Sequence, residues 1–171
     1  MEYVLPFSYW DFALISSRAF MITTIDGDGA ILLYRFSCPD EPIPVHVATL
    51  WMPPLQDDRV MLFLSSHSGP FLAKPPCETE FTTRPDSRIQ VLSVGYQNGN
   101  MLFGNAHHFG FFYVHNRTLE KYVMDHGRTG VLDGESIEKT HPSIAIDVPW
   151  HEWGPENTRF NIIRSPTHWL R

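Results

Sequence analysis

The amino-acid sequence predicts an all-β fold made of antiparallel meander sheets. Short runs rich in β-branched and aromatic residues recur along the 171 residues, and clusters of Gly, Pro, Asn and Asp separate them. The clearest case is 19–36, where two such runs flank Asp26-Gly27-Asp28-Gly29. Glycine can adopt the positive φ of a tight reversal, and aspartate can bond its own backbone, so this stretch predicts a β-hairpin.

Eight runs of this kind are expected to form strands, joined mostly by tight turns. The run 88–96 alternates most cleanly between apolar and polar side chains, which is typical of a strand with one face on a core. Pro53-Pro54 ends the run 45–51. The expected strands are 10–16, 20–25, 30–36, 45–51, 60–66, 88–96, 107–115 and 160–164, with 101–103 as a short segment that pairs back after a turn at Asn98-Gly99.

Helical periodicity is nearly absent from the sequence. Only residues 117–124 place apolar side chains at helical spacing, and this segment could form one or two helical turns or another strand. The segments 37–44, 74–87 and 125–141 are expected to be surface loops, and 144–159 is interpreted as turn-rich. Many short strands with so little helix predict a sandwich, a barrel or part of a propeller.

Composition and charge exclude several classes of protein. Hydrophobic residues make up 43% and aromatic residues 13% of the chain, which is enough to build a core. The net charge is −6, and the sequence shows no basic stripe of the kind that contacts phosphates in nucleic acids. We therefore expect no nucleic-acid partner.

The cysteines and the apolar runs indicate a compartment. Cys38 and Cys77 make no disulfide framework and have no metal or redox spacing, which favours a reducing environment. No signal-peptide pattern begins the sequence, and no stretch approaches the roughly 18 apolar residues of a membrane span. We expect a cytoplasmic or nuclear protein with no membrane association.

No pattern in the sequence predicts catalysis or a cofactor. His107 and His108 are adjacent on a predicted strand, so their side chains point to opposite faces and cannot share a metal ion. Residues 65–69 contain serine and histidine but no Gly-x-Ser-x-Gly elbow. Residues 26–29 share two letters with a calcium loop and lack its later ligands. We expect a protein that is not an enzyme and has no cofactor.

Tryptophans near the end of the chain form the one candidate binding surface. Trp150, Trp153 and Glu152, together with Trp51, could make an aromatic platform for a peptide or a sugar, because tryptophan supplies much contact area at low entropic cost. The alternatives are that the tryptophans belong to the core, and that Glu152 is a solvated turn residue rather than half of an acid pair with Glu156.

Part of the predicted hairpin resembles a propeller blade. An apolar strand, Asp-Gly and a second strand ending in Tyr34-Arg35-Phe36 are similar to the two central strands of a WD-repeat-type blade, although the WD signature is absent. The resemblance implies a partial β-propeller-like fold, with a β-sandwich as the alternative. It also implies that residues 1–171 are a single β-rich domain or a fragment of a larger β-propeller.

A second resemblance covers nearly the whole chain and concerns function. The runs 7–19, 66–73, 113–119 and 148–159 together resemble the C-terminal β-rich region of the F-box proteins of mushroom-forming fungi. In that family an N-terminal helix bundle docks on the adaptor of a ubiquitin ligase, and the β-rich region behind it would hold the substrate. This sequence shows no helix bundle at its start.

The second resemblance implies a non-enzymatic protein-interaction module, similar to the substrate-recognition region of fungal F-box proteins. One alternative is a carbohydrate-binding or glycan-hydrolysing β-domain that uses Trp150 and Glu152. Another is a truncated product without independent function. The partner would be a protein, and open sheet edges would favour self-association.

Overall fold

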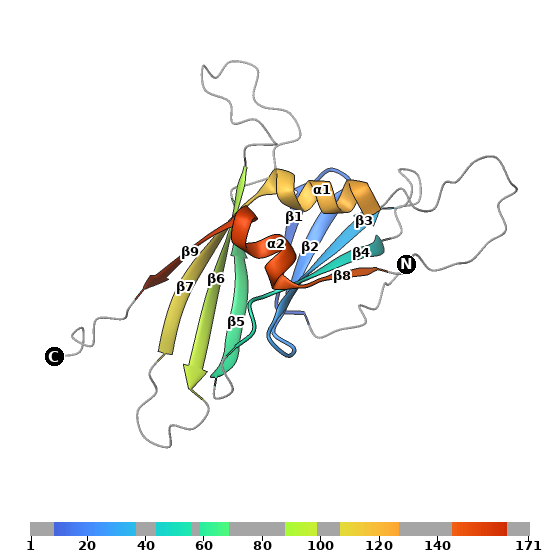
Figure 1. Cartoon of the computed structure of the whole chain (residues 1–171). Helices are drawn as coiled ribbons and strands as arrows, with labels where there is room; N and C mark the ends of the chain where they lie inside the picture. Colours follow the sequence, from blue (N-terminus) through green and yellow to red (C-terminus); the bar gives the residue numbers. More distant parts are fainter. Residues whose placement is uncertain are drawn as a thin grey trace, which may run out of the picture.

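The computed structural model describes residues 9–36, 44–55, 59–68, 88–98, 107–126 and 145–163. In these ranges the chain is mostly β and forms two sheets (Figure 1), which confirms the predicted all-β class. Sheet A has the order β1-β2-β3-β4-β8, and sheet B has the order β5-β6-β7-β9. The strands of sheet A are β1 (Asp11–Ser16), β2 (Ala19–Thr24), β3 (Ala30–Phe36), β4 (Pro44–Trp51) and β8 (Ile146–Val148), and those of sheet B are β5 (Arg59–His67), β6 (Ile89–Asn98), β7 (His107–His115) and β9 (Thr158–Ile163).

The predicted hairpin is present as β2 and β3. Its strands pair in antiparallel register from Ala19 opposite Arg35 to Thr24 opposite Ala30. Gly27 and Gly29 both have positive φ, at 63° and 85°, and the Gly29 amide donates to the Asp26 carbonyl over 3.1 Å. The glycines therefore act in the turn as expected, whereas the Asp28 carboxylate accepts from the Leu55 amide over 3.1 Å and not from its own turn. Whether the two sheets belong to a partial propeller or a sandwich stays a prediction.

The structure decides one open alternative and corrects one interpretation. Residues 117–124, expected to form either helical turns or a strand, lie in helix α1 (Asn116–His126). Residues 144–159, interpreted as turn-rich, contain β8 and helix α2 (Trp150–Asn157), so that interpretation was wrong. Gly154 and Pro155 weaken the helical signal of α2, but burial of Trp153 holds the helix in place. The pairing of β8 with β4 is parallel, whereas only antiparallel pairing was expected.

Several predicted features lie outside the described residues. They are most of the 37–44 loop, the 74–87 excursion, the Asn98-Gly99 turn beyond Asn98, the 101–103 segment, most of the 125–141 loop, Cys38 and Cys77, and both ends of the chain.

The main core lies between the two sheets and beneath the helices. Figure 1 shows α1 across one end of sheet A and α2 between β8 and β9. The largest buried side chains come from both sheets and both helices, because each of these elements turns apolar side chains inward. They include Ile15, Met21, Leu33 and Leu50 of sheet A, Leu64, Leu92 and Phe112 of sheet B, Leu119 of α1 and Trp153 of α2.

The sheets meet at the edge strands β1 and β5, where side chains take the place of ladder hydrogen bonds. Buried Asn116 donates its Nδ2 to the Ile15 carbonyl of β1 over 2.8 Å and accepts from Gln90 Nε2 over 2.9 Å. In the other direction, the Ser66 amide of β5 donates to the Asp11 carboxylate over 2.7 Å. The Thr23 hydroxyl donates to the Leu64 carbonyl. Three backbone groups at these edges are thereby paired with side chains of α1 or of the opposite sheet.

An aromatic row crosses the face of sheet A that points away from sheet B. Phe20 stacks on Tyr34, and Tyr34 stacks on His46, with ring centroids 5.0 Å apart in each pair. His46 is half-buried, and burial holds the pKa of this imidazole below its ordinary 6.5. The hydrogen bond to the Ala48 carbonyl and the nearby Asp147 carboxylate oppose that shift less strongly.

Replacing Asn116 with alanine should lower the free energy of unfolding by roughly 2–4 kcal/mol. Gln90 and the Ile15 carbonyl would lose a buried partner, at about 1–3 kcal/mol for each unsatisfied group. Urea unfolding followed by circular dichroism measures the loss. Asn161→Ala is the control, because Asn161 is exposed on β9 and its truncation should cost less than about 0.5 kcal/mol. Equal losses in the two variants would contradict the role given to Asn116.

The shifted pKa of His46 should make stability depend on pH. The unfolded chain binds the proton more readily than the folded chain, so this contribution is complete above pH 6.5 and is lost as the pH falls through 6.5 towards the folded pKa. His46→Phe keeps a stacked ring without the titration. The difference in unfolding free energy between the two proteins, measured by urea unfolding from pH 7.5 to 5.5, should move in favour of the variant. A difference independent of pH would refute the assignment.

Candidate functional site

The face of sheet B that points away from the core carries exposed aromatic and aliphatic side chains. In β6 and β7 the inward positions are Leu92, Val94, Phe112 and Val114, which are buried. Because neighbouring residues of a strand alternate, the residues between them point outward. The outward-pointing apolar residues are Val60 and Phe63 of β5, Ile89 and Val91 of β6, and Phe109, Phe111 and Tyr113 of β7, and we call this surface the aromatic face.

A glycine shapes the middle of the aromatic face. Gly95 lies opposite both Phe63 and Phe109, in the strand between them. A Cβ atom at Gly95 would overlap with Cε1 of Phe63, so only glycine lets this ring lie over β6. The ring then reaches Phe109, with the centroids 6.0 Å apart. The two phenylalanines form one continuous apolar surface across three strands.

A pocket of about 280 Å³ opens at one end of the aromatic face, and we call it the corner pocket. It forms where β7 runs directly into α1 and where α2 runs directly into β9. Pairing of Val114 with Thr158 brings these two junctions together. The hydroxyl of Thr118 donates to Oδ1 of Asn157 over 3.4 Å and links them. The residues that line the corner pocket are Ile89, Tyr113, His115, Arg117, Thr118, Glu156, Asn157, Thr158 and Arg159.

The charges of the corner pocket favour an anion. The lining contains two arginines, Arg117 and Arg159, and one carboxylate, Glu156, although the net charge of the whole chain is −6. Arg159 donates one hydrogen bond from Nη1 to the Thr158 carbonyl over 3.0 Å. The side chains of Arg117 and His115 are exposed, and within the described ranges they form no hydrogen bond or ion pair. Their donors are therefore available to a ligand.

The four residues predicted as a binding surface gather around α2, but they differ in exposure. Trp153 is 0% exposed, and its Nε1 donates to the Trp51 carbonyl over 2.7 Å. Trp150 is half-buried and packs edge-on against Phe112 and Trp153, with centroids 5.5 and 5.2 Å away. Trp153 is thus a core residue, which removes one of the two rings that a platform on α2 would need.

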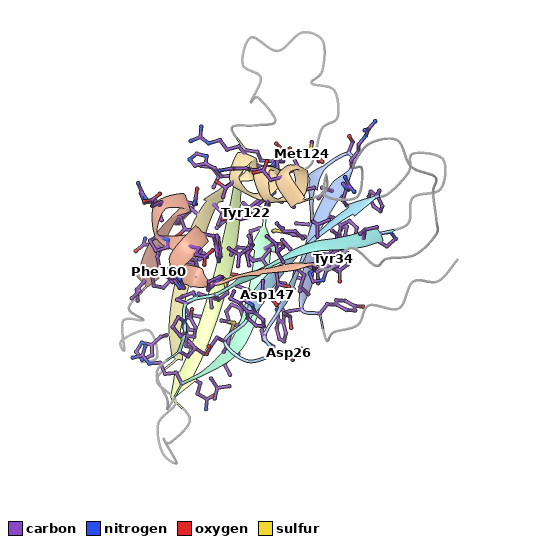
Figure 2. All side chains as sticks on the ribbon, turned by 45° about the vertical axis from the view of Figure 1, so that its right-hand side comes forward. Asp26, Tyr34, Tyr122, Met124, Asp147 and Phe160 are labelled. Carbon is purple, nitrogen blue, oxygen red and sulfur yellow. The ribbon has the colours of Figure 1, made fainter. Side chains whose placement is uncertain are left out.

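Trp51 and Glu152 are the exposed members of that group. Trp51 is 39% exposed, and its Nε1 donates to Oδ1 of Asp147 over 3.2 Å; Figure 2 shows Asp147 on β8. Glu152 lies 3.8 Å from Nε2 of His151 at the surface. Burial, and secondarily the Glu152 carboxylate, raise the pKa of Tyr122 on α1. Trp51 thus joins β4 to β8, and Glu152 lies at the surface of α2.

Catalytic and metal-binding arrangements are a separate question from the aromatic face. The described residues contain no cluster of three or more His, Cys, Asp or Glu side chains placed to hold a metal ion. His67 Nε2 lies 2.8 Å from the Ser93 hydroxyl, and among the described residues no carboxylate contacts this histidine. A serine–histidine pair without an orienting group lacks the third member of a catalytic triad.

Comparison of the chain with known protein families, curated proteins and solved structures finds no match. In the described part of the structure, no helix has both the length and the apolar character needed to span a membrane.

No pattern in the sequence indicates the corner pocket. Arg117 and Arg159 lie 42 positions apart, each beside a junction between a strand and a helix, and only the β7–β9 pairing makes them neighbours. Tyr113 was predicted in a strand, and the alternation of buried and exposed residues along that strand is the one local pattern that could have placed it outward.

Replacing Trp153 with phenylalanine should destabilise the fold by roughly 2–4 kcal/mol, because it leaves a small cavity and removes the donor to the Trp51 carbonyl. Trp51→Phe, which removes only an exposed hydrogen bond to Asp147, should cost less than about 1 kcal/mol. Urea unfolding of both variants gives the comparison. If Trp153→Phe were the milder change, the core assignment would be wrong.

Proposed function

We propose that the chain is a non-enzymatic protein-interaction module and that the aromatic face is its binding surface. The observation that supports this most directly is the exposure of large apolar side chains on one sheet face. Phe109 and Tyr113 are each 37% exposed and lie on the same strand. Exposed apolar side chains gathered in one patch are typical of a surface that a partner covers.

The composition of the face fits a protein partner. Aromatic residues are enriched at the centre of protein interfaces, and four of the seven residues of the aromatic face are aromatic, namely Phe63, Phe109, Phe111 and Tyr113. The face is built on three hydrogen-bonded strands, so little conformational entropy is lost when a partner binds. Affinity would come from a few aromatic contacts and from shape.

The resemblance to the C-terminal β-rich region of fungal F-box proteins gives this proposal a cellular context. In that context the aromatic face would hold a protein destined for ubiquitin ligation, and the module would act in the cytoplasm or nucleus. No catalytic residue is assigned in this role, because the module would position a substrate without changing it.

The double variant Phe109→Lys/Tyr113→Lys should abolish partner binding while leaving the fold intact. Both side chains are partly exposed, so lysine can reach water there, and two positive charges prevent an apolar partner from covering the face. Affinity capture from an extract of the native host cells, quantified by mass spectrometry, compares the wild type with the variant. Thermal unfolding of the purified proteins checks that the variant is folded.

The matched control for this experiment lies on α1. Met124, labelled in Figure 2, is 62% exposed, and Met124→Lys places a similar charge on a different surface. Proteins captured by the wild type and by Met124→Lys should be lost with the double variant. Capture that is the same for all three proteins would show that the aromatic face is not the binding surface.

A further inference from the structure

We infer that the partner of the aromatic face is a peptide segment that carries an acidic side chain close to apolar ones, with the acidic group bound in the corner pocket. This inference rests on the proposed function and specifies the chemistry of the partner. It joins two observations, the uncharged aromatic face and the positively charged corner pocket at its end, into one binding surface.

The two parts of this surface share a wall. Tyr113 and Ile89 belong to the aromatic face and also line the corner pocket. A segment that packs on the aromatic face near Tyr113 therefore reaches the pocket without crossing another element. Next to Tyr113 across the sheet is Arg159, its direct partner on β9. An apolar contact and a cationic contact thus lie side by side.

The donors in the corner pocket suit a carboxylate. A guanidinium presents paired N–H groups that match the two oxygens of Asp or Glu, and such charge-assisted bonds are stronger than neutral ones. Arg117 is the better placed of the two arginines, because it has no hydrogen bond or ion pair to any described residue. Arg117 also belongs to the first turn of α1, where the helix dipole adds positive potential.

Glu156 repels an acidic ligand, so removing its charge should have the opposite effect to removing the arginine charges. Its carboxylate lines the same pocket as the two arginines. Removing the arginine charges should weaken the binding of an acidic ligand, whereas removing the Glu156 charge should strengthen its binding. Damage to the fold would weaken binding in both cases, so the opposite signs separate electrostatics from unfolding.

The spacing along β7 sets the length of the peptide. Phe109 and Tyr113 are four residues apart, or about 13 Å, and Phe109 and His115 are six residues apart, or about 20 Å, at roughly 3.3 Å per residue. An extended peptide has a similar rise. An apolar residue seated against Phe63 and Phe109 would therefore lie roughly four to six residues from the acidic residue in the corner pocket.

The test is selection of random twelve-residue peptides, displayed on phage, against the full chain. Selected peptides should contain Asp or Glu four to six residues from an aromatic or large aliphatic residue. The tightest one is then synthesised with its acidic residue and with the matching Gln or Asn. The acidic form should bind the wild type roughly tenfold more tightly, and fluorescence polarisation measures both.

Variants of the chain complete the experiment. Arg117→Gln/Arg159→Gln should lower the affinity for the acidic peptide by roughly tenfold, so that the acidic peptide and its Gln or Asn form bind equally well. Glu156→Gln should raise the affinity for the acidic peptide by about two- to threefold. Arg18→Gln/Arg59→Gln is the control: it removes the same charge from two exposed arginines, one in the turn between β1 and β2 and one at the opposite end of sheet B. This control should bind like the wild type.

The outcomes separate the inference from the proposed function. A face variant without added charge, Phe109→Ser/Tyr113→Ser, is used here, because lysine at Tyr113 would itself attract an acidic peptide. Peptides that lose binding to Phe109→Ser/Tyr113→Ser but show no preference for an acidic residue would overturn the inference and leave the aromatic face as the binding surface. Peptides that bind this face variant as tightly as the wild type would overturn both, and so would a selection that enriches no peptide.

Discussion

The hydrogen bonds of Asn116 are the interaction on which the rest of the structure depends. Two sheets that only touched through apolar side chains could slide, and the edge of β1 would keep unpaired carbonyls beside the core. Asn116 bonds the Ile15 carbonyl of β1 and the Gln90 side chain of β6 at once, from a fully buried position. It fixes the distance and the register between the sheets in a way that apolar contact cannot.

The same residue also places the site. Asn116 is the first residue of α1 and directly follows the last residue of β7, so its anchoring sets where the chain leaves sheet B. Arg117 and Thr118 follow it into the corner pocket. On the other side of the pocket, the Thr158 hydroxyl donates to the Gly154 carbonyl and holds the junction between α2 and β9. Binding groups on two fixed junctions need little reorganisation to meet a ligand.

Local chemistry explains which parts of this fold the sequence could predict. The hairpin of β2 and β3 depends on residues adjacent in the chain, and Asp26 and Gly29 mark its turn. The three residues of β8 form a strand only because β4 lies alongside, and α2 forms around Trp153 despite Pro155. Tryptophan predicts large contact area in either a core or an interface, and only tertiary structure distinguishes buried Trp153 from exposed Trp51. The corner pocket depends on pairing distant in sequence.

The capped edges also bear on self-association, which the open sheets of the predicted fold would favour. Asp11, Thr23 and Asn116 occupy backbone groups at the β1 and β5 edges, so a second chain cannot easily add a strand there. Among the described strands, β8 and β9 are the other sheet edges. β9 is the longer of the two, and its Phe160 and Ile162 are 45% and 55% exposed; Figure 2 shows Phe160 at this margin. Self-association, if it occurs by strand addition, is therefore directed to β9, next to the corner pocket, where it would compete with a peptide ligand.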